Sequence, residues 1–99
     1  QLASDVAQQF IEAASHPKDG ANVYNLGAPV ASVADFVSHI HKELPESNIT
    51  IGDTILPFPE AFDDSALKAS ADTVYETPLA DGIQQTIKHF QRCIEDDLL

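Results

Sequence analysis

The sequence predicts a single domain of the α/β class, with α+β as the alternative, built from three main helices and a small parallel βαβ unit. Three observations support this prediction. The chain has 99 residues, which suits one hydrophobic core and leaves no room for a second. Two short segments rich in strand-forming residues flank a helical pattern within about thirty residues, as in a βαβ unit. A long amphipathic pattern then follows near the C-terminal end.

Apolar residues at helical spacing predict the first helix over residues 5–16. Ser4 is its candidate N-cap, and the negative charge of Asp5 suits the first turn. The ring of Pro17 disfavours helical geometry at His16, so we expect the helix to end there.

The βαβ unit is predicted over the next segments. Residues 22–26 are short, rich in strand formers and closed by a glycine, which indicates a strand. Ser32 and Asp35 form a variant of the capping box that begins a helix, and Pro45 ends it. Residues 49–52 indicate the second strand, parallel to the first with a right-handed crossover. One face of the helix carries the apolar residues Val33, Phe36, Val37, Ile40 and Leu44.

The stretch from Leu56 to Asp64 is predicted to be a loop, because Pro57 and Pro59 flank Phe58 and can sustain neither a helix nor a full sheet ladder. One or two helical turns are expected over residues 65–71, capped by Asp64 or Ser65.

A long C-terminal helix is predicted to start at Thr77 and Pro78, which supply an N-cap and a first-turn proline. We expect its end to fray, since the acidic residues 95–97 lie near the negative pole of the helix dipole. Its apolar stripe consists of Leu79, Ile83, Ile87, Phe90 and Ile94.

The amino-acid composition limits the kinds of partner that the chain is expected to bind. Sixteen acidic against five basic residues give a net charge of −11, so nucleic acid and anionic membrane surfaces are not expected partners. No apolar run approaches the length of a membrane-spanning helix, and no signal peptide is visible. The only cysteine, Cys93, cannot form an internal disulfide, which fits a cytoplasmic protein. The sequence contains no methionine, so we expect it to be a piece of a longer protein.

Common catalytic and metal-binding patterns are missing from the sequence. The glycines, at positions 20, 27, 52 and 82, form no phosphate-binding loop, and there is no G-x-S-x-G motif. His39 and His41 point about 200° apart on a helix, so we interpret them as solvated residues and expect no metal site. Cys93 lies at the edge of the last apolar stripe, where a half-buried, unreactive thiol is favoured over a nucleophile.

Acidic residues in the predicted loop leave two alternatives open. Glu60, Asp63 and Asp64 could bind a hard cation, although solvated acids are the favoured interpretation. Residues 64–67 also resemble the Asp-Ser-Leu attachment site of acyl carrier proteins, while a plain helix cap explains the same residues.

The order of the segments resembles the C-terminal part of the extended short-chain dehydrogenase/reductases, the NAD(P)-dependent nucleotide-sugar epimerase/dehydratase family. The most specific block is Thr77-Pro78-Leu79-Ala80-Asp81-Gly82-Ile83, followed by Thr86, Ile87 and Phe90. Further matching blocks are Asp5-Val6-Ala7, Val23-Tyr24-Asn25-Leu26-Gly27, Ser32-Val33-Ala34-Asp35-Phe36 and Asp64-Ser65. Ser70-Ala71 replaces the family's usual Leu-Gly.

The resemblance implies a substrate-side portion of a Rossmann-type enzyme. The family's Gly-rich cofactor loop is missing from the sequence. Its Tyr-x-x-x-Lys pair is missing too, because the residue four positions after Tyr24 is Ala28 and the residue four positions after Tyr75 is Leu79, where the family has lysine. The 99 residues would therefore hold neither catalytic residues nor the cofactor, and NAD or NADP would bind the upstream part of the parent enzyme.

By the same resemblance, the loop from Leu56 to Ser65 faces the substrate cleft, with Phe58, Asp64 and Ser65 binding a small molecule such as a nucleotide-sugar. The alternative for Phe58 is that its ring covers the core. Exposed apolar faces also predict a homo-oligomer. The alternative function is a stand-alone acidic interaction module, and its most specific version is an acyl-carrier-like protein.

Overall fold

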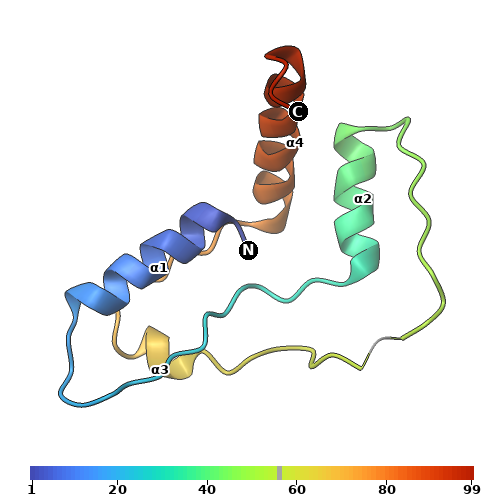
Figure 1. Cartoon of the computed structure of the whole chain (residues 1–99). Helices are drawn as coiled ribbons and strands as arrows, with labels where there is room; N and C mark the ends of the chain where they lie inside the picture. Colours follow the sequence, from blue (N-terminus) through green and yellow to red (C-terminus); the bar gives the residue numbers. More distant parts are fainter. Residues whose placement is uncertain (56) are drawn as a thin grey trace. The chain divides into compact units, whose positions relative to one another are not determined.

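A computed structural model describes residues 1–55 and 57–99, and all the regular secondary structure in them is helical (Figure 1). Two compact units are present. The first comprises Gln1–Val30 and Pro57–Thr77, and the second comprises Ala31–Leu56 and Pro78–Leu99, of which residue 56 lies outside the described part. The helices are α1 (Ala3–Ser15), α2 (Val33–Glu43), α3 (Ser65–Lys68) and α4 (Leu79–Glu95).

The predicted α/β class and its parallel βαβ unit are wrong, because no strand occurs within residues 1–55 and 57–99. Residues 22–26 and 49–52 were expected to form strands but join no ladder in the described chain. Strand propensity mainly reflects packing on a paired, half-buried surface, and without that surface an extended segment remains irregular. Val23, for example, is 89% exposed.

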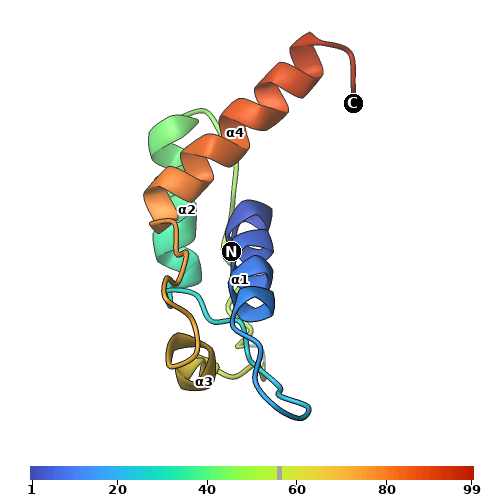
Figure 2. The same cartoon turned by 90° about the vertical axis from the view of Figure 1, so that its left-hand side faces the viewer.

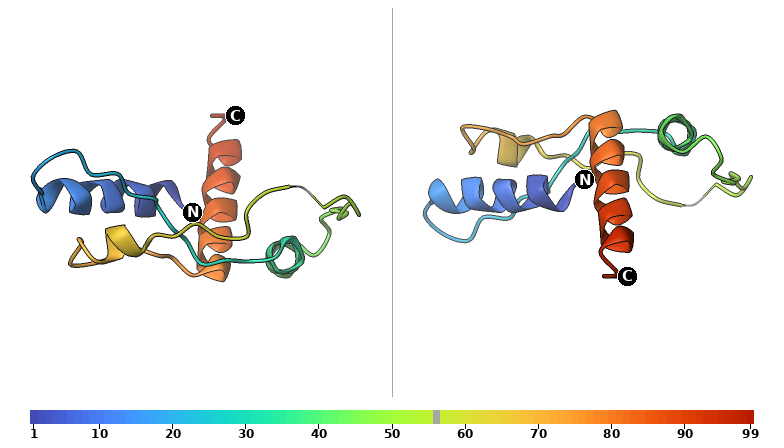
Figure 3. Two further views of the ribbon diagram at one scale, coloured as in Figure 1. Left: turned by 90° about the horizontal axis from the view of Figure 1, so that it is seen from below. Right: turned by 90° about the horizontal axis from the view of Figure 1, so that it is seen from above.

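In the first unit, α1 lies close to its predicted range. It begins one residue before Ser4, so Leu2 is the N-cap and no side chain caps the helix, while Asp5 lies in the first turn as expected. The helix ends at Ser15, and His16 is its C-cap. After the short helix α3, the chain runs back along α1 (Figure 3).

In the second unit, α2 and α4 pack against each other, with α4 crossing α2 (Figure 2). The predicted capping box of α2 is confirmed, since Ser32 Oγ accepts a hydrogen bond from the backbone N–H of Asp35 at 3.0 Å. The apolar stripe of α4 is buried most deeply at Ile83, and it becomes exposed toward Phe90 and Ile94.

The C-terminal end of α4 differs from the expected frayed end. The N–H of Leu98 donates to the carbonyl of Cys93 at 2.8 Å, and the N–H of Asp97 donates to the carbonyl of Ile94 at 3.2 Å. Asp97 adopts a left-handed conformation with φ of 55°. These features form a Schellman motif, which satisfies carbonyl groups that a helix end otherwise leaves free.

Candidate functional site

The predicted substrate residues lie in the first unit, at and before α3. Asp64 is the N-cap residue of α3 and Ser65 is its first residue, whereas Phe58 lies in the irregular segment before it with 74% of its surface exposed. Asp64 and Ser65 are consecutive in the chain, and both lie at the start of α3. The structure gives no support to the alternative in which Phe58 covers the core.

Gly27 allows its segment of the chain to pack closely against the start of α3. A Cβ atom at this position would lie 1.7 Å from Asp64 Oδ2 and 2.7 Å from Asp64 Cβ, so only glycine fits here. The amide of Asn25 donates to the carbonyl of Asp63 at 2.9 Å, and the Gln1 side chain donates to the Gly27 carbonyl. These contacts take the place of the ladder predicted for residues 22–26.

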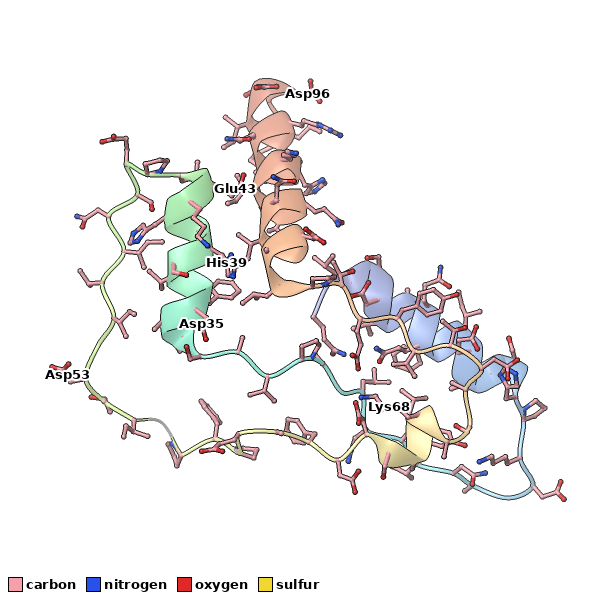
Figure 4. All side chains as sticks on the ribbon, turned by 180° about the vertical axis from the view of Figure 1, so that it is seen from behind. Asp35, His39, Glu43, Asp53, Lys68 and Asp96 are labelled. Carbon is pink, nitrogen blue, oxygen red and sulfur yellow. The ribbon has the colours of Figure 1, made fainter. Side chains whose placement is uncertain are left out.

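Lys68 neutralises two carboxylates beside this junction (Figure 4). Its Nζ atom lies 3.0 Å from Asp64 Oδ2 and 3.1 Å from Glu76 Oε1. Hydrogen bonds to these two carboxylates raise the pKa of Lys68 above its usual range, with that to Asp64 the larger cause. The carboxylate of Asp64 is thus paired, which makes it a poor general base.

Asp63 carries the other carboxylate of this junction. It accepts a hydrogen bond from the backbone N–H of Ser65 at 3.0 Å. Hydrogen bonds from the Ser65 side chain and then from its backbone lower the pKa of Asp63. An ionised carboxylate of this kind can accept hydrogen bonds from ligand hydroxyl groups, but it is a weak base for proton abstraction.

A cation site at these acids is not supported. Within the described ranges, no group of three or more histidine, cysteine or acidic side chains is arranged to hold a metal ion. Asp64, one of the three acids interpreted as solvated, is paired with Lys68 instead.

A polar stripe on α1 holds the segment that follows α3. Asp5 accepts hydrogen bonds from the backbone N–H and the hydroxyl of Thr77, at 2.7 and 2.8 Å. The amide of Gln9 donates to the carbonyl of Tyr75 at 2.8 Å. Thr77 was expected to cap α4, but its hydroxyl binds Asp5 instead, and Pro78 is the N-cap with no side-chain hydrogen bond.

His16 completes this stripe at the other end of α1. Its Nε2 atom lies 3.1 Å from Asp72 Oδ2, and its Nδ1 atom lies 3.0 Å from the carbonyl oxygen of Glu12. The Glu12 carbonyl is the larger cause of a raised pKa of His16, followed by the Asp72 carboxylate. Together, Asp5, Gln9 and His16 attach α1 to the segment 72–77.

The two histidines of α2 belong to the second unit. Both His39 and His41 are half-buried rather than fully solvated. His39 lies on the side of α2 that faces α4, like Glu43, whose carboxylate oxygens both lie 3.4 Å from the amide nitrogen of Gln84 (Figure 4).

A contact between two polar side chains on α4 was not predicted from the sequence. Cys93 Sγ lies 3.6 Å from His89 Nε2, and the thiol is free and half-buried. The prediction of a half-buried, unreactive thiol did not take His89 into account. The signal was nevertheless present, because residues four apart on a helix lie on one face.

Two further results bear on the function. None of the helices in the described chain is long and apolar enough to cross a membrane. Comparison with known proteins gives no match to any family model, curated protein or solved structure.

Proposed function

We propose that the chain is the substrate-binding, C-terminal portion of an NAD(P)-dependent nucleotide-sugar epimerase/dehydratase or a related oxidoreductase. The observation that carries the proposal is the sequence block of residues 77–83 with its continuation to Phe90, which resembles this family. Its placement at the start of α4 is consistent with that resemblance, as are the starts of α1 and α2.

The chemistry of the junction at α3 fits binding rather than catalysis. Asp63 is held ionised and Asp64 is paired with Lys68, so neither is suited to proton transfer. Carboxylate oxygens and the Ser65 hydroxyl are suitable partners for the hydroxyl groups of a sugar. The exposed ring of Phe58 offers an apolar surface for a ligand ring.

In this proposal the cofactor, NAD or NADP, binds a part of the enzyme outside these 99 residues. The coding sequence upstream of Gln1 should then encode a Gly-rich cofactor loop and a Tyr-x-x-x-Lys pair. Calorimetric titration of the 99-residue chain with NAD(H) and NADP(H) should give no binding, because the chain lacks the glycine spacing that holds a pyrophosphate. Micromolar binding by this chain alone would contradict the proposal.

A matched pair of variants in the complete enzyme tests the binding role of Phe58. Phe58 and Phe62 are 74% and 66% exposed in the same segment, so truncating either should affect stability little. Phe58→Ala should raise KM or lower kcat/KM, while Phe62→Ala should leave both unchanged. Equal kinetics in the two variants would remove Phe58 from the substrate site.

The proposal includes self-association and a cytoplasmic location. Exposed apolar side chains on α1, α2 and α4 support association, and the free thiol of Cys93 fits a reducing compartment. Sedimentation of the chain from micromolar to millimolar concentration tests the first point. A strictly monomeric chain throughout this range would contradict it.

A second candidate function is an acyl-carrier-like module. The observation that favours it is the helical architecture of the described residues, with the exposed Ser65 directly after Asp64 at the start of α3. Incubation with coenzyme A and a phosphopantetheinyl transferase, followed by mass spectrometry, distinguishes the two functions. An adduct on the wild-type chain that Ser65→Ala loses would support the carrier, whereas an unmodified chain would exclude it.

A further inference from the structure

His89 and Cys93 bring two metal-binding atoms together on one face of α4. The imidazole Nε2 and the thiol Sγ lie 3.6 Å apart, one helical turn from each other. The ring of Phe90 stands edge-on to the imidazole, with ring centroids 5.7 Å apart, which restricts its orientation. His89 is exposed, so a cation and its water ligands can approach from solvent.

The separation of the two atoms matches one edge of a tetrahedral zinc site. Zinc–sulfur bonds of about 2.3 Å and zinc–nitrogen bonds of about 2.0–2.1 Å at a tetrahedral angle place the two ligand atoms about 3.6 Å apart. Sγ and Nε2 already have this spacing. The pair can therefore span one cation without a change in the helix backbone.

The electrostatic surroundings favour a cation. The site lies in the last turns of α4, where the helix dipole is negative and the acidic residues 95–97 follow (Asp96 is labelled in Figure 4). The basic residues Lys88 and Arg92 precede His89 and Cys93 directly, so their side chains point about 100° away from the pair. The Schellman motif holds the Cys93 backbone through the N–H of Leu98.

We propose that His89 and Cys93 form a two-ligand site for a thiophilic divalent cation, with Zn²⁺ as the natural occupant and water in the remaining positions. On binding, the thiol proton passes to solvent as the sulfur–metal bond forms, and no oxidation state changes. The described residues provide no group of three or more ligands, so affinity should fall below that of a closed structural zinc site.

Titration of the 99-residue chain with Co²⁺, under a reductant that contains no thiol, tests the proposal. The wild type should bind one equivalent and develop the near-ultraviolet charge-transfer band of a cobalt–thiolate bond. Cys93→Ser should lose the band. His89→Gln should weaken binding about tenfold or more, since even outer-shell partners of a metal contribute about 10–100-fold. The matched control His39→Gln, on α2, should bind as the wild type does.

Either of two results with the variants would overturn the proposal. The first is wild-type affinity of His89→Gln for Co²⁺, which would mean that the thiol acts alone, and the second is a charge-transfer band that persists in Cys93→Ser. Nitrogen NMR of the wild-type chain gives an independent measurement that needs no variant. Addition of Zn²⁺ should shift the imidazole resonances of His89 and leave those of His39 in place, and unchanged His89 resonances would equally overturn the site.

Discussion

The helices α1 and α4 bury opposite kinds of surface, although both sequences have an amphipathic pattern. In the first unit, α1 buries Gln9 to 1% exposure and attaches the segment 72–77 through polar side chains, while Phe10 is 63% exposed. In the second unit, α4 buries Ile83 of its apolar stripe and packs on α2. Hydrogen bonds dominate the first contact and apolar burial dominates the second.

The difference shows that an apolar stripe predicts a helix without predicting which face is covered. The amide nitrogen of Gln9 donates to the backbone carbonyl of Tyr75, but the amide oxygen of Gln9, Oε1, is buried without a hydrogen-bond partner among the described residues. A buried polar group without a hydrogen bond destabilises a structure. The contact of α1 is thus the weaker kind per residue.

Leu67→Ala should have the largest effect on stability, because Leu67, at 1% exposure, is the most buried apolar side chain of the first unit. Truncating a fully buried leucine typically lowers the free energy of unfolding by about 2–5 kcal/mol. Urea denaturation followed by circular dichroism measures this loss. Ile94→Ala is the control, since Ile94 is 66% exposed and should change stability by less than about 0.5 kcal/mol. Similar losses for both would mean that Leu67 is not a core residue in solution.

Gly27→Ala should have the next largest effect, because the new Cβ would overlap the side chain of Asp64. Forcing an extra methyl group into a packed contact typically costs about 1–3 kcal/mol. Gly52→Ala in the second unit is a matched control, since a Cβ at that position meets no atom within 4 Å. The comparison is made by denaturant titration of the two variants. An unchanged midpoint for Gly27→Ala would show that the contact with Asp64 is not maintained.

The helices could be predicted from the sequence, whereas the fold class could not. The capping box at Ser32, the proline at residue 78 and the periodic apolar residues are local signals, and α2 and α4 begin within one or two residues of them. A strand depends on a partner, which local sequence does not specify. Residues 22–26 therefore read as a strand, yet in the structure Asn25 and Gly27 contact the start of α3.

The candidate site was predictable only where its residues are neighbours in sequence. Asp64 and Ser65 were predicted together and lie together. The pairing of Asp5 with Thr77 joins residues far apart in the sequence, and no single-sequence signal reports such a contact. The contact between His89 and Cys93 could have been predicted, because residues four apart on a helix lie on one face.

Ser32→Ala should have a smaller effect, because it removes the N-cap of α2 and leaves the backbone N–H of Asp35 without its acceptor. Loss of such a cap typically lowers stability by about 1 kcal/mol. Ser38→Ala is the control on the same helix, where the hydroxyl only donates to the Asp35 carbonyl. Thermal melts of both variants should show the lower midpoint for Ser32→Ala, and equal midpoints would indicate that the cap contributes nothing in solution.

The smallest expected effect is a pH dependence that originates at His16 in the first unit. The Glu12 carbonyl and then the Asp72 carboxylate raise the pKa of His16 in the folded chain above its ordinary value of 6.5. A raised folded pKa means that the folded state binds the proton more tightly than the unfolded state does. The stability from this interaction is therefore fully present below about pH 6.5 and is lost as the pH rises through the folded pKa.

The urea midpoint of the wild type should accordingly fall more between about pH 6 and about pH 8 than that of His16→Gln. Asp72→Asn should show an intermediate dependence, because it removes the second cause of the pKa shift and leaves the Glu12 carbonyl in place. Both side chains are accessible to solvent, so added salt should reduce the difference between wild type and variants. Identical pH profiles for the wild type and His16→Gln would mean that segment 72–77 is held on α1 by Asp5 and Gln9 alone.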